Sequence, residues 1–313
     1  MGRKLMYIGK QMIGDLSPRE YLCDTDADLA TLPEACTGSM AVSLESGKVY
    51  VVSTFGNWIP FGEGYVEKDP NAPLPAGLYV DGVMTASWDE LVSNGTITVE
   101  NNVITGSNAD ALVGDIVIAE GITEIGEEGF NECVNLTSVV LPNSVTRIDD
   151  YGFWGCLALT HIVFGGGIEF IGAGAFYNCE KLEEVQLGDS VSFIGDEAFY
   201  GCANVSAIII GNNVTTIGAN AFEGNTTITS ITIPDAVTYL GSNALAYCDN
   251  LKSVVIGSGI DNIPYGVFEG CVSLTDITYN GTVAQWNAIE LGNGWNEEVP
   301  ATEVICTDGK VAL

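Results

Sequence analysis

The chain has 313 residues, 47% of them hydrophobic and 16% charged, so it is long and apolar enough to bury a substantial core. Ten lysines and arginines stand against 41 acidic residues, and the formal net charge of −31 argues against nucleic-acid binding because it repels phosphate backbones. The longest apolar runs are too short to span a bilayer, so we expect no membrane insertion.

Residues 1–68 contain no internal repeat but hold a cluster of basic residues. Four of the ten basic residues lie within the first twenty positions: Arg3, Lys4, Lys10 and Arg19. The start has neither a continuous apolar segment nor a small-residue cleavage site, so we predict no secretory signal. A β-hairpin is predicted from strands at 40–44 and 49–53 around a polar turn, within a small β-rich domain.

Residues 69–113 are predicted to form a proline-containing linker followed by an N-terminal cap. The stretch "EKDPNAPLPAG" (67–77) holds three prolines and is typical of a linker. Residues 86–106 predict a short helix and a hairpin with Asn101 and Asn102 at its turn. We expect this segment to cap the first repeat, since an open solenoid end needs a lid.

From Ile125 onward the chain repeats with a period of about 23 residues, without an insertion, through seven units. Seven apolar columns stay in register; in the third unit they are Ile171, Phe176, Cys179, Leu182, Val185, Leu187 and Val191. A half unit with Ile116, Ile118 and Ile122 precedes them, so the array is predicted to start near Gly114. Such regularity predicts a solenoid in which stacked units share one core.

Each unit predicts the same local structure. Alternating positions such as Val185 and Leu187 indicate a strand, and a turn and a second short extended piece follow it. Residues 195–205 have apolar spacings of three and four, which favour a short helix or 3₁₀ turn. We therefore predict an α/β solenoid, a leucine-rich repeat of about seven units, over 114–283.

Four stretches resemble segments of known families. "VTRIDDYGFWGCLALTHIVF" (145–164) and "VSFIGDEAFYGCANVSAIII" (191–210) resemble the BspA-type leucine-rich repeat, whose arrays often end in a segment similar to 279–313. The resemblance implies that 284–313 is a C-terminal cap in which Trp286 and Trp295 cover the last repeat. Residues 1–68, with "DTDADLATLPEACTGSMAV" and "GNW", resemble an N-terminal module of tailed-phage virion proteins.

The cysteines predict a buried file. Six of the nine occupy one repeat column, where they would point in the same direction, and a disulfide needs converging side chains. The chain lacks a C-x-x-C pair and has one histidine, His161, so we predict no metal site, no cofactor and no catalytic cysteine. Asn225 replaces the column once, and its amide is expected to bond to backbone.

Three other features have structural explanations. Gly172-Ala173-Gly174 lacks the following lysine and long helix of a phosphate-binding loop, so we interpret it as a turn. His161 is expected to face solvent, since nothing marks a serine and an aspartate as its partners. Six acids lie where each helical turn would begin, at positions suited to its dipole: Glu127, Glu128, Asp149, Asp150, Asp196 and Glu197. A divalent-cation file along these acids is the alternative left open.

Three outward rows are the candidate ligand-binding surface, because contiguous exposed apolar and aromatic groups mark interaction sites. The long-strand row is Val140, Val163, Gln186, Ile209, Thr232, Val255 and Thr278. The short-strand row is Arg147, Phe170, Phe193, Thr216, Tyr239 and Asn262. The turn row is Trp154, Tyr177 and Tyr200. The alternative to ligand binding is that the rows pack on one another or on a neighbouring subunit.

The phage resemblance implies a non-enzymatic display protein, a head fiber or tail-associated adhesin made in the host cytoplasm and carried on the virion surface. Its N-terminal module, with Arg3, Lys4, Lys10 and Arg19 as candidate docking residues, would bind capsid or tail proteins. The repeats would bind a bacterial surface, mucus, or a host glycan or protein. A homotrimer is implied by resemblance, although no heptads enforce it. The alternatives are an extracellular bacterial cell-surface adhesin and, from another class, a glycan-active enzyme.

Overall fold

The computed structural model describes residues 76–80 and 83–313, and before them the backbone of five strands. These are β1 (Met6–Ile8), β2 (Glu20–Cys23), β3 (Met40–Ser43), β4 (Lys48–Val52) and β5 (Trp58–Glu63), which form one sheet in chain order. Strands β3 and β4 are antiparallel, as the predicted hairpin requires. Arg3, Lys4, Lys10 and Arg19 lie outside the described residues, so their docking role stays a prediction.

A short helix and two hairpins precede the repeats. They comprise β6 (Gly77–Val80), β7 (Val83–Ser87), α1 (Trp88–Ser93), β8 (Ile97–Glu100) and β9 (Val103–Ser107). The Ser87 hydroxyl accepts the Glu90 N–H while the Glu90 carboxylate accepts the Ser87 N–H, a capping box that starts α1. Asn101 and Asn102 both have positive φ, as the turn of the β8–β9 hairpin needs. The predicted helix and hairpin are confirmed.

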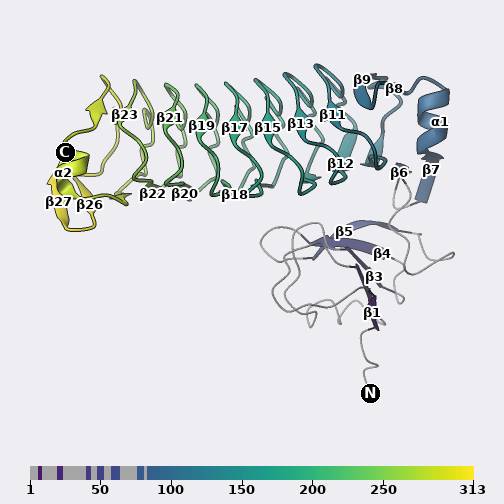
Figure 1. Cartoon of the computed structure of the whole chain (residues 1–313), viewed down its shortest axis with the longest axis horizontal. Helices are drawn as coiled ribbons and strands as arrows, with labels where there is room; N and C mark the ends of the chain where they lie inside the picture. The colour runs from purple at the N-terminus through teal and green to yellow at the C-terminus, as the bar shows by residue number, and fades with distance from the viewer. Residues whose placement is uncertain are drawn as a thin grey trace.

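The repeats form a β-solenoid of about nine turns of about 23 residues, with two strand files (Figure 1). The long-strand face consists of β10 (Gly114–Val117), β12 (Leu136–Val140), β14 (His161–Val163), β16 (Glu184–Gln186), β18 (Ala207–Ile209), β20 (Ser230–Ile233), β22 (Ser253–Ile256), β24 (Asp276–Tyr279) and β26 (Glu303–Cys306). The short-strand face consists of β9, β11 (Glu124–Ile125), β13 (Arg147–Ile148), β15 (Phe170–Ile171), β17 (Phe193–Ile194), β19 (Thr216–Ile217), β21 (Tyr239–Leu240), β23 (Asn262–Ile263) and β25 (Glu290–Leu291).

The strands pair in parallel so that equivalent residues of successive units lie side by side. Val139 is opposite Ile162, and Ile148 is opposite Ile171, so the members of each pair are one repeat apart. The solenoid begins where β9 pairs with β11, and β6 runs antiparallel beside β10. The predicted register of the columns is therefore confirmed, and the cap hairpins extend the same two files.

The third side, the turn face, has no helix, and here the helical alternative predicted for residues 195–205 is wrong. Tyr200 N–H bonds to Glu197 C=O three residues earlier, but Phe199 N–H bonds to Ala221 of the next unit. Glu197 and Gly201 both have positive φ, which interrupts any continuous helix. The same alternation of single turns and bonds to the next unit recurs along the array, so this side is also a hydrogen-bonded ladder.

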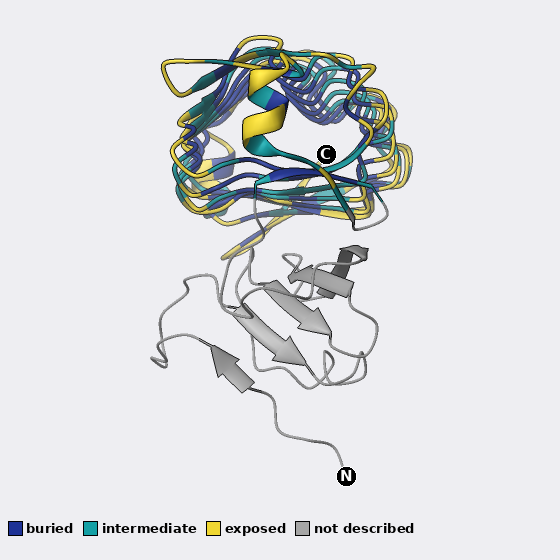
Figure 2. Ribbon diagram, turned by 90° about the vertical axis from the view of Figure 1, so that its right-hand side faces the viewer, coloured by how far each residue is buried: buried dark blue, intermediate teal, exposed yellow. Residues whose placement is uncertain are grey.

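The three sides enclose one continuous core (Figure 2). Phe130, Phe153, Phe176, Phe199 and Phe222 are fully buried and stack with ring centroids 5.0–5.7 Å apart. The seven apolar columns supply most of this core, because one strand or turn per unit cannot bury its apolar side alone. A further column with Ala175 and Ala198, and residues of both caps such as Leu91 and Trp295, complete it.

The C-terminal tail closes the solenoid with a longer turn. Helix α2 (Val283–Trp286) is inserted between β24 and β25, and β27 (Gly309–Ala312) pairs antiparallel with β26. Trp286 and Trp295 are buried, with Trp295 packing on Phe268 and Trp286 on Tyr279, so their predicted covering of the last repeat is confirmed. Neither α1 nor α2, the helices among the described residues, is long enough to cross a membrane.

Candidate interaction surface

The cysteine column is a buried file of hydrogen-bond donors. Its members are fully buried free thiols: Cys133, Cys156, Cys179, Cys202, Cys248 and Cys271. Each thiol from Cys156 onward donates to the backbone carbonyl oxygen 26 residues earlier, as Cys179 does to Phe153 at 3.3 Å. Asn225 takes the same role through Nδ2, which donates to Phe199 and Phe222 carbonyls at 2.9 and 2.8 Å. The expected backbone bonding of Asn225 is confirmed.

Burial makes the thiols of Cys133 and Cys202 poor nucleophiles. It raises the pKa of Cys133 to about 11 and that of Cys202 to about 12. A metal ligand or nucleophile must be the thiolate, so burial opposes both roles. Among residues 76–80 and 83–313, no three His, Cys, Asp or Glu side chains group as metal ligands would.

Gly172 and Gly174 permit close packing between units. A Cβ on Gly172 would lie 2.6 Å from backbone atoms of Asp149 and Asp150, and one on Gly174 would lie 2.8 Å from the Tyr151 ring. Gly174 also has φ of +57°, a left-handed conformation that favours glycine. The neighbouring unit fills the space that a side chain at either glycine would need, which supports the interpretation of this stretch as a turn.

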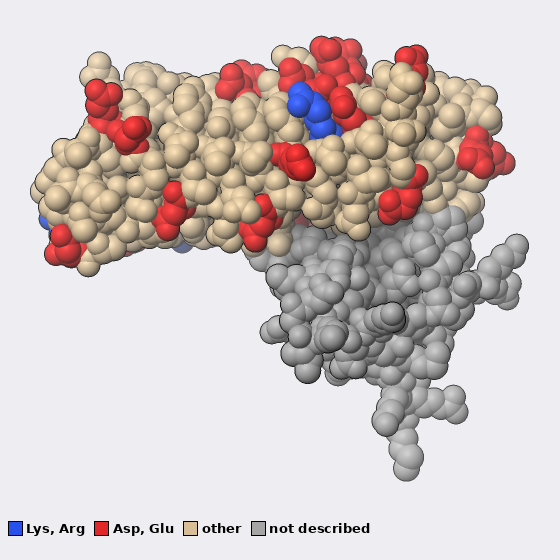
Figure 3. Space-filling model, in the orientation of Figure 1, with Lys and Arg blue, Asp and Glu red and all other residues tan. Residues whose placement is uncertain are grey.

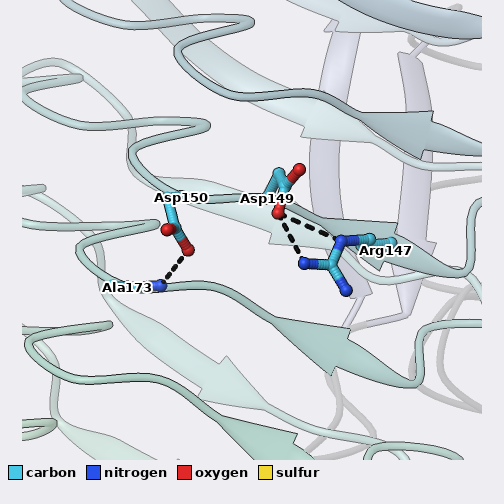
Figure 4. A network of polar contacts seen from close by, with 4 residues as sticks. All are labelled: Arg147, Asp149, Asp150 and Ala173. Carbon is cyan, nitrogen blue, oxygen red and sulfur yellow. Dashed lines mark hydrogen bonds and ion pairs between the residues drawn. The ribbon is translucent and has the colours of Figure 1, made fainter.

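The acids of the turn face bond to neighbouring units and side chains (Figure 4). Asp150 Oδ1 accepts the Ala173 N–H at 2.7 Å, and Asp196 accepts the Ala219 N–H at 2.7 Å. Asp149 Oδ1 accepts both Nε and Nη2 of Arg147, at 3.0 and 2.7 Å. The predicted helix-dipole role of these acids is wrong because no helix is present. Asp150 and Asp196 bond to N–H groups of the next unit instead, and Asp149 bonds to Arg147.

His161 is half-buried on the long-strand face. Its Nδ1 lies 2.8 Å from Thr160 Oγ1 and its Nε2 lies 3.4 Å from Glu183 Oε2. Burial lowers the pKa of His161, while the charges of Glu183 and Asp115 raise it to a lesser degree. Ser138, on the adjacent strand, donates its hydroxyl to Asp115 at 2.7 Å. The partners of His161 are thus Thr160 and Glu183, and the hydroxyl of Ser138 is directed to Asp115. His161 and Ser138 do not form a nucleophile–base pair.

The long-strand row lies on the outer side of its sheet. Val140, Val163 and Val255 are half-buried, and Ile209 is 38% exposed. Gln186, Thr232 and Thr278 interrupt the aliphatic side chains. The row is therefore a mixed surface with short apolar segments rather than one continuous stripe.

The short-strand row is stacked at its N-terminal end and exposed further along. Phe170 and Phe193 are half-buried and stack with centroids 4.6 Å apart and planes 1° from parallel. Arg147 lies on the preceding strand, and its guanidinium carbon is 3.6 Å from the centroid of the Phe170 ring. Thr216 follows Phe193, and Tyr239 beyond it is 57% exposed. The row thus combines internal packing with one projecting ring.

The turn row is also stacked. Trp154 and Tyr177 have ring centroids 6.2 Å apart, and Tyr177 and Tyr200 have centroids 4.7 Å apart with planes at 5°. All three side chains are half-buried. Because each ring covers the face of its neighbour, the row presents ring edges and hydroxyl groups outward.

Sequence reasoning missed the continuation of the turn row. The same column continues through Glu223, Ala246 and Glu269. Glu297 takes the equivalent place in the tail. Its carbonyl oxygen accepts the Gly270 N–H, just as the Trp154 carbonyl oxygen accepts the Glu132 N–H at the start of the row. One repeat period beyond Tyr200 lies Glu223, and two further periods reach Glu269. Glu297 could not be found in this way, since the tail turn is longer.

Acidic side chains are spread over the visible side of the solenoid, where basic side chains are few (Figure 3). Within the described residues the lysines and arginines are Arg147, Lys181, Lys252 and Lys310. A surface of this kind attracts cationic groups and repels anionic ones.

The comparisons with known proteins concern the repeat region. The BspA type leucine rich repeat region matches residues 108–192 and 169–289, in six copies. Similar solved structures include a leucine rich cell surface protein from Faecalibacterium prausnitzii, at 27% identity over 57% of this chain and 62% of that one, TM-score 0.42. The T. pallidum leucine rich repeat protein is 25% identical over 61% and 73%, TM-score 0.39.

A leucine-rich repeat protein from Bacteroides ovatus is 26% identical over 58% of this chain and 44% of that one, TM-score 0.43. This chain spans 62% of the length of the Faecalibacterium protein. None of the curated proteins matches the chain in sequence.

The two family matches overlap and together extend over residues 108–289, more than half of the chain. This family consists of surface and interaction proteins that are typically non-catalytic. The chain belongs to the BspA-type leucine-rich repeat family.

Proposed function

We propose that this protein is a non-enzymatic, adhesin-type interaction protein that binds its target through the outer rows of the solenoid. The observation that carries the proposal is the short-strand row, where Phe170 and Phe193 are held in a stack and Tyr239 projects from it. Side chains fixed in this way lose little conformational freedom on binding, which favours affinity. Membership of a family of surface proteins supports the same function.

A triple variant tests this role: Phe170→Ser, Phe193→Ser and Tyr239→Ser in the full chain. We expect it to lose at least about tenfold in affinity for bacterial cells or mucin, because aromatic anchors dominate binding energy. The matched control changes three exposed apolar residues outside the rows, Val134→Ser, Leu157→Ser and Val272→Ser. Unchanged binding by a correctly folded triple variant would exclude the short-strand row.

We further propose that the display surface is a phage particle. Residues 1–68 would dock to capsid or tail proteins, and the solenoid would bind a bacterial surface, mucus, or a host glycan or protein. The support is the resemblance of residues 1–68 to a virion module and the four basic residues in its first twenty positions. Deleting residues 1–68 is expected to abolish incorporation, measured by mass spectrometry of purified particles. Particles that retain the truncated protein would contradict docking through this module.

A bacterial cell-surface adhesin is the second candidate, and family membership favours it. Fractionation separates the two: the protein is expected in purified particles in the first case and in the cell-surface fraction in the second. A glycan-active enzyme has less support, since a hydrolase needs two opposed carboxylates across a cleft. Asp150 and Asp196 bond to backbone of the next unit instead.

A further inference from the structure

The turn row divides into two chemically different halves. Its first half is the stacked rings of Trp154, Tyr177 and Tyr200, and its second half holds Glu223, Glu269 and Glu297, with Ala246 between the first two glutamates. Both halves lie on the same side of the same ladder, so a partner that follows the solenoid axis meets rings and then carboxylates.

The aromatic half suits side-chain contacts better than sugar stacking. The faces of Tyr177 are covered by Trp154 on one side and Tyr200 on the other. A sugar needs an open ring face, and the row supplies mainly edges. Glu223 follows Tyr200 in the row, so no ring of the row covers the second face of Tyr200.

The carboxylate half carries negative charge without a cationic partner. Among the described residues, none of Glu223, Glu269 and Glu297 forms an ion pair. Glu223 Oε2 is shielded from solvent and has no hydrogen-bond partner, while Glu269 accepts the Tyr247 hydroxyl at 2.9 Å. Burial, and after it the charges of Glu197 and Glu269, raises the pKa of Glu223, as expected of a carboxyl group that has no cation beside it.

The molecule itself contains an example of the group that would fit this junction. On the short-strand face, the Arg147 guanidinium stacks 3.6 Å from the Phe170 centroid, at the end of a ring stack, and donates two hydrogen bonds to Asp149. At the junction of the turn row, Tyr200 ends a ring stack and Glu223 supplies the carboxylate. A planar cation is the group that satisfies both neighbours.

We propose that the turn row docks an arginine-containing basic segment of a partner protein, with one guanidinium against the outer edges of Tyr200 and Glu223 and further cationic groups at Glu269 and Glu297. Three rungs of about 4.8 Å separate Glu223 from Glu297, so an extended segment of about four or five residues spans the carboxylate half. The net charge of −31 supports a basic partner. The inference rests on the proposed interaction function and specifies the partner chemistry.

The test measures binding of a fluorescent Arg-Gly-Ser repeat peptide to the full chain at physiological salt, by fluorescence anisotropy. One variant combines Glu223→Gln, Glu269→Gln and Glu297→Gln. The matched control, Glu100→Gln with Glu120→Gln and Glu169→Gln, removes equal charge from exposed positions outside the row. We expect about a tenfold loss of affinity in the first variant and less than about twofold in the control. Tyr200→Leu is expected to weaken the arginine peptide more than a Lys-Gly-Ser peptide, because guanidinium stacks on rings more favourably than ammonium does.

Several outcomes would overturn the proposal. Equal losses in the two Glu→Gln variants would mean attraction to the whole acidic surface, and absence of binding would exclude a basic peptide as occupant. Self-association of the chain that the row variant abolishes would assign the row to a second copy instead. If the row variant binds the arginine peptide as the wild type does while the short-strand triple variant loses cell or mucin binding, the docking proposal fails and the adhesin function stands.

Discussion

Phe176 and Tyr177 are neighbours in one turn but belong to two different regions of the molecule. Phe176 lies in the interior, in a file of five stacked phenylalanines, while Tyr177 lies on the outer surface in a row that begins with tryptophan and ends with glutamate. The interior repeats its chemistry from turn to turn, and the surface row does not.

The difference has a physical cause. An interior side chain must fill the same space and satisfy the same carbonyl at every turn, so thiols recur and Asn225 substitutes for one as a donor. An outer side chain only has to fit beside its neighbours of the row. Its identity is therefore available for recognition, and the outer rows are where specificity resides.

The largest effect that tests this comparison comes from Phe176→Ala. It removes a fully buried ring that stacks on Phe153 and Phe199, and we expect a loss of about 3–5 kcal/mol in the free energy of unfolding. Tyr177→Ala, one residue further, is expected to cost about 1 kcal/mol or less. Denaturant titration measures both. Similar losses at the two positions would break the distinction between interior and surface.

Asn225 tests whether the interior file selects donors rather than thiols. Asn225→Asp places an acceptor against two carbonyl oxygens at a buried site, and we expect a cost of about 3 kcal/mol. Asn225→Cys restores the thiol found in six other units and leaves no unpaired Oδ1, so it is expected to change stability by about 1 kcal/mol or less. A large cost for the cysteine variant in denaturant titration would contradict this explanation.

The interior was predictable from the sequence because burial acts identically at each repeat. The columns of Ile171 and Phe176 recur once in every unit, and both positions are buried as predicted. Side-chain type and period were sufficient to place the strands and the buried thiol file. The helical alternative for residues 195–205 was wrong because apolar spacing of three and four also arises in successive turns, where Glu197 and Gly201 adopt positive φ.

The outer surface was predictable only in part. The outward position of Tyr177 and Tyr200 followed from the register, whereas their stacking depends on the rotamers that neighbours impose. Glu223 shares their column but differs in chemistry, so a search for aromatic rows passes over it. Glu297 joins the row through a longer turn that the repeat period does not include.

Gly172→Ala tests how tightly successive turns are coupled. Its new Cβ would lie 2.6 Å from backbone atoms of Asp149 and Asp150, which cannot move aside without disturbing the ladder. We expect a loss of about 2 kcal/mol by denaturant titration. Gly166→Ala is the matched control, since its Cβ would meet only the Asn143 side chain at 3.4 Å. Equal stability of the two variants would show that the turns tolerate separation.

The smallest expected effect concerns Glu223, where the surface row reaches partly into the interior. Its pKa in the folded protein is raised above the ordinary 4.5, first by burial and then by Glu197 and Glu269. Folding therefore favours the protonated form, and the stability this contributes is lost as pH rises through the folded pKa. Glu223→Gln is expected to raise Tm by about 1 °C at about pH 7.

Below the ordinary pKa of 4.5 the advantage of Glu223→Gln over the wild type should disappear, because the wild-type carboxyl group is then protonated as well. Thermal melts at the two pH values measure this, with Glu100→Gln at the exposed end of β8 as the control for lost charge alone. A Tm gain that persists at low pH would assign it to packing instead. A gain confined to neutral pH would mean that the Glu223 carboxylate destabilises the protein when no partner is bound. This is expected of a group whose cation is supplied by a partner.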